Sequence, residues 1–412
     1  MIDEKLKESI KLLDYDSDSY YIFDKPRFIK EVKKFKNTFK EINPIFSYSY
    51  KTNYVKPLII GVDEFNFLSE LVSPFEVEVS RVFGINPSKI IYNGPVKDDD
   101  SIKYVVKNRG LVNADNIYDL KRILAICSKL DLSFIPRLGI RFSFESVDLC
   151  SRFGIQNSEE NIDKIVYQFK EYSIQNIECL HIHFPDRDII AFEKRVNAAL
   201  SLAKYLNESK IKINSIDIGG GFPSDMENIM QNSLGIKNPT MLSEYAKVLK
   251  KLKEFYNFKD LPVILEPGTA IASNSLHLVG HIKSINKKDK IAFFNTDISR
   301  TLLGGLKNHV KYPTVHIPTE KNADNSLPFG KDIDISLTGF SCVEGDIIGA
   351  DIDKFKNTKI MDKFVLSSIG SYSCVFKSPF IRGDIALFIW DGENLSLSRR
   401  SQNANDINSL YL

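Results

Sequence analysis

Apolar runs of strand length recur along the first two thirds of the chain, and stretches with helical periodicity separate them. We interpret the following runs as strands: 44–50, 66–71, 89–92, 110–113, 134–138, 178–183, 215–218 and 261–265. Amphipathic helices are clearest at 116–129, 161–172, 189–205 and 243–256. Alternating strands and helices are typical of parallel sheets with right-handed crossovers. Eight such units over 26–275 therefore predict an α/β fold, a (β/α)8 barrel of the TIM type, with a doubly wound sheet as the alternative.

The pattern changes after residue 275. Short strand-like runs then follow one another, with turn residues between them and few helical stretches, at 276–285, 290–294, 333–340, 346–348, 363–366 and 385–390. This succession predicts a second, mostly β domain over 276–412. Residues 1–25 are assigned to neither domain by their pattern, and they are a candidate addition to the second one.

The composition is that of an ordinary globular protein, with 43% hydrophobic and 26% charged residues in a chain of 412. A formal net charge of +2 is too small to produce an electrostatic potential that would attract nucleic acid or an anionic membrane. No stretch approaches the ~20 apolar residues of a membrane span, and the N-terminus lacks the apolar region of a secretory signal. The five cysteines are scattered without metal-ligand spacing. We therefore expect a cytoplasmic protein without a metal site.

Residues able to do chemistry fall at the ends of four predicted strands. Lys51 ends the first strand, His181 and His183 end the sixth, three glycines at 219–221 follow the seventh, and Glu266 follows the eighth. A barrel builds its active site at the C-terminal ends of its strands, so these motifs should meet at one rim.

Each of these motifs also has an ordinary structural explanation. A lysine after a strand is usually solvated, whereas Lys51 kept dry in the barrel mouth would have a lowered pKa and could form a Schiff base. The glycines at 219–221 form either a tight turn or an approach for a phosphate. We expect His181 and His183 to face opposite sides of their strand, which would leave one of them as an ordinary buried histidine.

Two further residues carry the same ambiguity. Glu266 either caps the next helix or binds a protonated ring nitrogen, and Cys342 is either a small buried hydrophobe or a reactive thiol. A Schiff-base lysine, a phosphate loop and an acid for a ring nitrogen are the parts that pyridoxal 5'-phosphate (PLP) needs. Taken together, the motifs make a PLP site plausible.

The chain also resembles a known family, the fold-type III PLP decarboxylases, which include the diaminopimelate and ornithine decarboxylases. The resemblance runs over nearly the whole chain in the family's order. Its motifs are SYKTN at 49–53, the stretch 71–97, NADNIYDL at 113–120, SRFGI at 151–155, LHIHF, DIGGGFP, LEPG, SCVEGD at 341–346 and GSY at 370–372. Such a resemblance implies the alanine racemase-like fold, a barrel with a β domain, and a homodimer with shared active sites.

The resemblance also implies roles in the reaction. Lys51 would carry PLP as an aldimine, His183 would stack on its ring, and Glu266 would pair with the pyridine nitrogen. Cys342 would enter from the partner subunit beside the substrate. The implied reaction is the decarboxylation of an amino acid, with Cys342 or Lys51 returning a proton to the α-carbon.

The phosphate of the cofactor has its own implied partners. Gly220, Gly221 and Gly268 would offer backbone to it, and Tyr372 would reach it from the β domain.

This sequence departs from the family on the substrate side. Phe184-Pro185 stand where the family has Gly-Ser, Thr269 where it has Arg, and Val343 where it has an acid for the substrate's distal amine. Tyr312-Pro313 and His316 replace further residues that grip diaminopimelate in the family. We therefore expect a small-molecule amino-acid substrate whose far end is neutral, masked or conjugated.

Two rival functions stay open. A racemase on the same fold would place Arg against the ring nitrogen, and Glu266 argues against it. A non-catalytic homologue that acts by binding a protein would not need intact Lys51, His183, Glu266, Cys342 and Tyr372.

Overall fold

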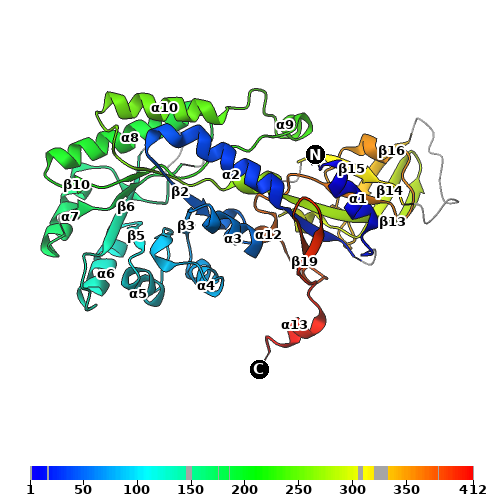
Figure 1. Cartoon of the computed structure of the whole chain (residues 1–412), viewed down its shortest axis with the longest axis horizontal. Helices are drawn as coiled ribbons and strands as arrows, with labels where there is room; N and C mark the ends of the chain where they lie inside the picture. The colour runs from blue at the N-terminus through cyan, green and yellow to red at the C-terminus, as the bar shows by residue number, and fades with distance from the viewer. Residues whose placement is uncertain are drawn as a thin grey trace.

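The computed structural model describes residues 2–15, 18–144, 151–174, 176–184, 186–304, 310–319, 333–378 and 380–411. In Figure 1 the chain forms two lobes, a strand–helix barrel at one end of the long axis and a strand-rich lobe at the other. Within the described residues, no helix combines the length and the apolar character needed to cross a membrane.

Eight parallel strands close into a barrel. In their order around the ring they are β2 (Pro44–Ser49), β3 (Leu68–Leu71), β4 (Ile90–Tyr92), β5 (Leu111–Ala114), β6 (Arg137–Ser143), β9 (Cys179–His181), β11 (Ile216–Asp217) and β12 (Val263–Leu265). The pairing of β12 with β2 closes the ring, and every neighbouring pair is parallel. The predicted barrel is confirmed, and the doubly wound alternative is wrong. The fifth strand begins later than expected, at Arg137, and runs on to Ser143.

The helices that follow these strands form the outer layer of the barrel (Figure 1). They are α3 (Lys56–Glu64), α4 (Pro74–Val82), α5 (Asp99–Lys107), α6 (Ile117–Ser128), α7 (Glu159–Glu171), α8 (Ile189–Glu208) and α10 (Leu242–Phe255), with α2 (Lys25–Phe39) before the first strand. Several begin at an Asp, Ser or Asn whose side chain accepts a hydrogen bond from the first turn, as Ser73 does at α4 and Asn116 at α6. These caps satisfy N–H groups that have no partner within the helix.

The second lobe is built on an eight-stranded sheet. Its strands are β1 (Tyr20–Asp24), β13 (Leu276–Lys288), β14 (Ile291–Thr296), β15 (Thr314–Ile317), β16 (Asp334–Thr338), β17 (Lys363–Leu366), β18 (Ala386–Trp390) and β19 (Leu395–Arg399). The sequence pattern missed β15 and β19, and the strand expected at 346–348 is wrong because Ile347 makes only a single bridge to Thr338.

The N-terminal segment contributes to this sheet. Strand β1 lies between β13, to which it is antiparallel, and β18, to which it is parallel. Helix α1 (Glu4–Leu12) buries Leu6 and Ile10 in a cluster that includes Val365 and Trp390. The pattern of residues 1–25 did not reveal this because the partner strands lie more than 250 residues away along the chain.

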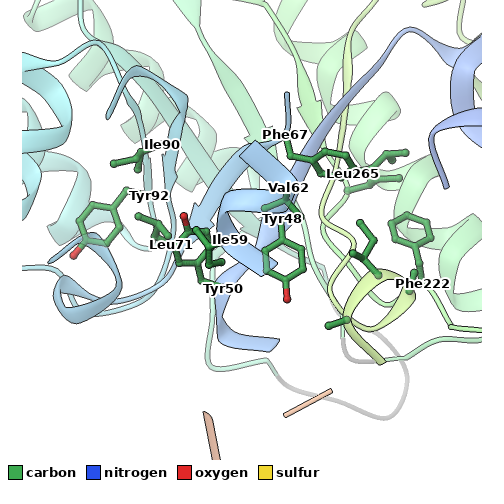
Figure 2. Close-up of a cluster of buried hydrophobic side chains, with 14 of the residues drawn as sticks. Tyr48, Tyr50, Ile59, Val62, Phe67, Leu71, Ile90, Tyr92, Phe222 and Leu265 are labelled. Carbon is green, nitrogen blue, oxygen red and sulfur yellow. The ribbon is translucent and has the colours of Figure 1, made fainter. Parts of the chain in front are cut away.

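The barrel core holds the segment around Lys51 in place. Figure 2 shows buried side chains from β2, β3, β4 and α3 packed together. Among them are Tyr48 and Tyr50, which lie just before Lys51 in the chain. Tyr48 Oη donates to the carbonyl of Asn53 at 2.9 Å, and Tyr50 Oη lies 3.1 Å from Ser69 Oγ. The aromatic bodies are therefore buried while their hydroxyls fix the path of the loop that carries Lys51.

Candidate active site

A cavity of about 200 Å³ lies at the C-terminal ends of the barrel strands. All of the residues predicted to bind the cofactor line it, namely Lys51, His183, Gly220, Gly221, Glu266, Gly268 and Tyr372, together with Ser49, Thr52, Arg187 and Thr269. Cys342 is not among the lining residues. It is exposed on the loop that follows β16, so its interpretation as a small buried hydrophobe is wrong.

Lys51 lies in a short 3-10 turn directly after β2, and Glu70 faces it from the end of β3. Lys51 Nζ donates to Glu70 Oε2 at 2.7 Å. Burial by itself would lower the pKa of Lys51, but the charges of Glu70 and Glu266 outweigh it and raise that pKa above its usual range. The expectation of a lowered pKa is therefore wrong, because the sequence did not reveal the carboxylates that surround the amine.

A chain of hydrogen bonds joins the acids beneath the cavity. The Asn93 amide donates to Glu70 Oε1 at 3.1 Å and to Glu266 Oε1 at 2.8 Å. Burial, followed by the negative charges of Asp217 and Glu70, raises the pKa of Glu266 well above its usual range. Burial also raises the pKa of Asp217 to about 7. At neutral pH Glu266 therefore holds a proton that an isolated carboxyl would have lost, whereas Glu70 beside Lys51 stays ionised.

His181 adds a buried imidazole to the same cluster. Its Nε2 lies 4.0 Å from Glu266 Oε1, and neither ring nitrogen has a hydrogen-bond partner. Ligand atoms of His181, Asp217 and Glu266 lie within 4.8 Å of one another, so this group could also hold a metal ion. The expectation that His181 and His183 face opposite sides is wrong, because residues two apart on a strand share a face.

His183 lines the cavity beside a buried arginine. Arg195 Nη1 lies 3.4 Å from His183 Nδ1, and Arg195 Nη2 donates to the carbonyl of Gly220 at 3.1 Å. A guanidinium can only donate, so Nδ1 of His183 accepts. Burial, and then the charges of Arg195 and Lys51, hold the pKa of His183 well below its usual range. The imidazole is therefore neutral, and Arg195 fixes its orientation.

Two glycines in the cavity wall lie so close to neighbouring residues that no side chain fits there. A Cβ on Gly220 would meet the Glu266 carbonyl oxygen at 2.7 Å, and a Cβ on Gly268 would meet Thr52 Oγ1 at 2.0 Å. Gly221 adopts φ +94°, a conformation that other residues rarely adopt. Gly268, and not Glu266, stands at the N-cap of the short helix α11 (Thr269–Ala272), so Glu266 is free of a capping role.

Tyr372 reaches the cavity from the second lobe, immediately before helix α12 (Ser373–Phe376). Its backbone N–H donates to the carbonyl of Thr52 at 2.8 Å. The Asn53 amide donates to the carbonyl of Gly370 at 2.8 Å. The loop that carries Lys51 and the segment that carries Tyr372 are thus tied directly to each other.

The residues that depart from the family pattern are spread more widely. Thr269 lines the cavity, whereas Tyr312 lines a second cavity next to it. Val343 is exposed, and His316 Nε2 lies 2.7 Å from Asp362 Oδ2. Pro185 lies outside the described residues.

Sequence reasoning missed four residues of this site, although each of them left a signal. Glu70, Asn93 and Asp217 lie at or directly after the C-terminal ends of β3, β4 and β11, so the rule that selected Lys51 applies to them as well. Arg195 falls on the buried face of α8 with Phe192 and Val196, a position where a charged residue is unusual.

Comparisons with known proteins identify the group to which the chain belongs. The sequence model for the pyridoxal binding domain of the pyridoxal-dependent decarboxylases matches residues 26–273. The chain belongs to the pyridoxal-dependent decarboxylase family. Its cofactor is accordingly PLP, and its reaction class is amino-acid decarboxylation.

Individual relatives of this decarboxylase are distant. A diaminopimelate decarboxylase of Aquifex aeolicus is 24% identical over 97% of each chain. Antizyme inhibitor 2 of Xenopus laevis is 24% identical over 66% of this chain and 57% of its own. The crystal structure of diaminopimelate decarboxylase from Helicobacter pylori, complexed with L-lysine, superposes with a TM-score of 0.79 over 98% of both chains at 19% identity, which shows the shared fold.

The cavity of the decarboxylase fits PLP. A primary amine, a neutral imidazole and a buried acid with a raised pKa meet there. Gly220, Gly221 and Gly268 line the same cavity and bring backbone without side chains to it, as a phosphate requires. Lys51, His183, Glu266, the glycines and Tyr372 are therefore the residues that would hold the cofactor.

Proposed function

We propose that the decarboxylase carries PLP covalently on Lys51 and uses it to release CO2 from the α-carboxylate of an amino acid. The observation that carries the proposal is the meeting of Lys51 and Glu266 in one cavity, one supplying an amine and the other a buried acid. Bound PLP supplies an electron sink next to the α-carbon. The bond from the α-carbon to the carboxylate breaks, its electron pair stays with the α-carbon, CO2 leaves, and a proton replaces it.

Lys51 must lose a proton before its nitrogen can attack the cofactor's carbonyl carbon. Glu70 accepts a hydrogen bond from Lys51 Nζ at 2.7 Å. Burial would raise the pKa of Glu70, but the charge of Lys51 outweighs it and lowers that pKa, so Glu70 holds the proton on Lys51 at neutral pH. Once substrate has displaced Lys51, the freed amine can return a proton to the α-carbon. Glu70 thus positions Lys51 and sets its charge without touching the substrate.

Glu266 sets the charge at the cofactor's ring nitrogen. It is buried, and its raised pKa favours the protonated form at neutral pH. Glu266 would hold the ring nitrogen of bound PLP in its protonated form through a close charge pair. We assign the group of Glu266, Asp217 and His181 to this role and not to a metal ion.

His183 and Arg195 act on the flat face of the ring. The neutral imidazole of His183 can stack on a ring without adding charge, and the Arg195 hydrogen bond keeps it from rotating. The contact of Arg195 with the Gly220 carbonyl ties the stacking residue to the phosphate side of the cavity.

The distribution of residues supports a shared site in a homodimer. Cys342 is exposed and lies outside the cavity of its own chain. We propose that Cys342 of the partner subunit completes the site and acts as a second proton donor.

The domain boundary proposed at 275/276, with residues 1–25 joined to the β domain, is supported by the pairing of β1 with β13 and β18. Free thiols at the described cysteines suit a reducing cytoplasm.

The test is to trap the cofactor on the purified holoenzyme with borohydride and to map the modified peptide. Modification of Lys51, a visible absorption band that borohydride bleaches, and loss of band and turnover in Lys51→Ala are expected. Modification of a different lysine would overturn the assignment. Interconversion of enantiomers without CO2 release would select the racemase instead, and a colourless protein that takes up no PLP would select a non-catalytic homologue.

A further inference from the structure

A second and larger cavity adjoins the cofactor cavity. It has a volume of about 790 Å³ and shares the lining residues Arg187, Thr269 and Tyr372 with the cofactor cavity, so the two lie side by side. We call it the side chamber. Its volume lies in the range of about 300–1,000 Å³ that is typical of pockets for drug-sized ligands.

The walls of the side chamber are mostly apolar. They come from helix α9 (Asn228–Ser233), from the loops that flank it, and from second-lobe segments near residues 303 and 376. The apolar and aromatic side chains are Met226, Met230, Leu234, Ile236, Tyr245, Leu303, Val310, Tyr312 and Phe376. Two lining residues, Arg187 and Asp188, carry a charge.

The charged lining residues do not suit a distal ammonium. The Asp188 carboxylate caps α8 and accepts from the backbone N–H groups of Ile190 and Ala191. Arg187 would repel a cation. Val343, which stands where the family places an acid and would enter with Cys342 from the partner subunit, carries no charge. A distal ammonium moved from water into this largely apolar chamber would lose much of its hydration, and Arg187 would oppose its attraction to Asp188.

Two hydroxyl groups in the walls are unsatisfied. Ser224 Oγ and Ser371 Oγ are buried and have no hydrogen-bond partner, and both residues line the chamber. Buried polar groups usually have partners, and a rotation of either serine side chain toward the chamber would let its hydroxyl bond a neutral polar group of a ligand. An amide is such a group, since it offers both an acceptor oxygen and a donor N–H.

We propose that the side chamber receives a neutral, largely apolar acyl arm, joined by an amide to the side chain of the amino acid that is decarboxylated. The amide removes the distal charge and can bond Ser224 and Ser371, while the acyl chain contacts Met230, Leu234 and Leu303. This inference rests on the proposed function, because it names the substrate class of the same active site.

The test compares free lysine with its Nε-acetyl, Nε-butyryl and Nε-hexanoyl derivatives on the PLP-loaded enzyme. We expect kcat/KM to rise along the acylated series by about fourfold per methylene, which follows from the free energy of burying one methylene. Leu234→Trp fills part of the chamber and should lower kcat/KM more as the acyl chain lengthens. Ile229→Trp is the matched control, because Ile229 lies on α9 but lines outer grooves instead of the chamber.

A binding measurement separates this inference from the proposed reaction. Calorimetry with N-hexanoyl-1,5-diaminopentane, the decarboxylated product, should show binding with a negative heat-capacity change that Leu234→Trp weakens and Ile229→Trp does not. Equal kcat/KM for free and acylated lysine, or no binding of the acylated amine, would overturn the acyl-arm proposal while leaving PLP on Lys51 intact. If the protein takes up no PLP and turns over no substrate, the proposed function fails. Calorimetry then still tests whether the side chamber binds the acylated amine.

Discussion

Lys51 Nζ donates a 2.7 Å hydrogen bond to Glu70 Oε2, and this contact joins the ends of two neighbouring barrel strands. Glu70 is almost completely buried, so water screens the attraction between Lys51 and Glu70 only weakly. The pair holds the amine in its charged form although burial opposes that charge. At neutral pH the pair is thus an ammonium and a carboxylate, because the charge of Lys51 also lowers the pKa of Glu70 although burial opposes it.

The first prediction concerns the pH at which the apoenzyme takes up PLP. Attack requires the neutral amine, and Glu70 raises the pKa of Lys51, so uptake by the wild type should accelerate only at high pH. Glu70→Gln removes the negative charge, lowers the pKa of Lys51 and should move the profile to lower pH. The measurement is the rate at which the visible band appears as a function of pH.

Glu31→Gln is the matched control for this variant, because Glu31 is a buried glutamate that bonds Asn274 away from the site. It should leave the uptake profile in place. Coincident profiles for wild type and Glu70→Gln would show that Glu70 does not control the charge of Lys51.

The second prediction concerns Glu266. Glu266→Gln keeps the size and the hydrogen-bonding shape of the side chain but cannot become a carboxylate beside a protonated ring nitrogen. The variant should retain bound PLP yet release CO2 in a single turnover more slowly, on the order of 10²–10⁴-fold. A single-turnover rate equal to that of the wild type would contradict the role given to Glu266.

The third prediction concerns the stability of the apoprotein. Burial raises the pKa of Asp217 to about 7 in the folded state, above its value in the unfolded chain. Between roughly pH 4 and 7 the folded state therefore binds more protons than the unfolded state, so its stability should fall as pH rises. Asp217→Asn keeps an oxygen for the Gly219 N–H but cannot ionise.

This variant should be more stable than the wild type at pH 8, by up to a few kcal/mol. At pH 4 the two should unfold alike, since Asp217 is then protonated in the folded wild type. Chemical denaturation of both apoproteins across this pH range provides the measurement, and a difference that does not change with pH would refute the assigned cause.

The fourth prediction concerns Arg195. Its guanidinium contacts His183 and the carbonyls of Phe184 and Gly220, a fork of contacts that an ammonium cannot reproduce. Arg195→Lys should weaken PLP binding by about 10- to 100-fold, as expected for the loss of charged hydrogen bonds. Arg137→Lys is the control, because Arg137 pairs with Glu178 on the barrel away from the cavity. Unchanged affinity in Arg195→Lys would show that Arg195 has only a packing role.

The fifth prediction tests the shared site. Lys51→Ala and Cys342→Ala are each expected to be inactive. Mixing them should restore part of the activity, because one of the two sites in a hybrid dimer would contain both wild-type residues. Failure to recover activity, once subunit exchange is demonstrated by mass spectrometry, would place the whole site within one chain.

The barrel could be predicted because its signal is local. Eight apolar runs, with capped amphipathic helices between them, determine strand and helix from the sequence of each segment. The same logic placed Lys51, His183 and Glu266 at one rim, since parallel strands in a barrel end on one side. The sheet of the second lobe was less predictable, because β1 pairs with strands from the far end of the chain.

The sequence by itself thus determined the fold class, the place of Lys51 at the rim of the barrel and the family. Only the tertiary structure decided the charge of that lysine, because its pKa depends on Glu70 and Glu266, which converge on it from other strands. It also decided the acid cluster around Asn93 and the apolar side chamber, whose walls come from both lobes. Charge states and cavities depend on distances between residues remote in sequence, and local patterns carry no information about those distances.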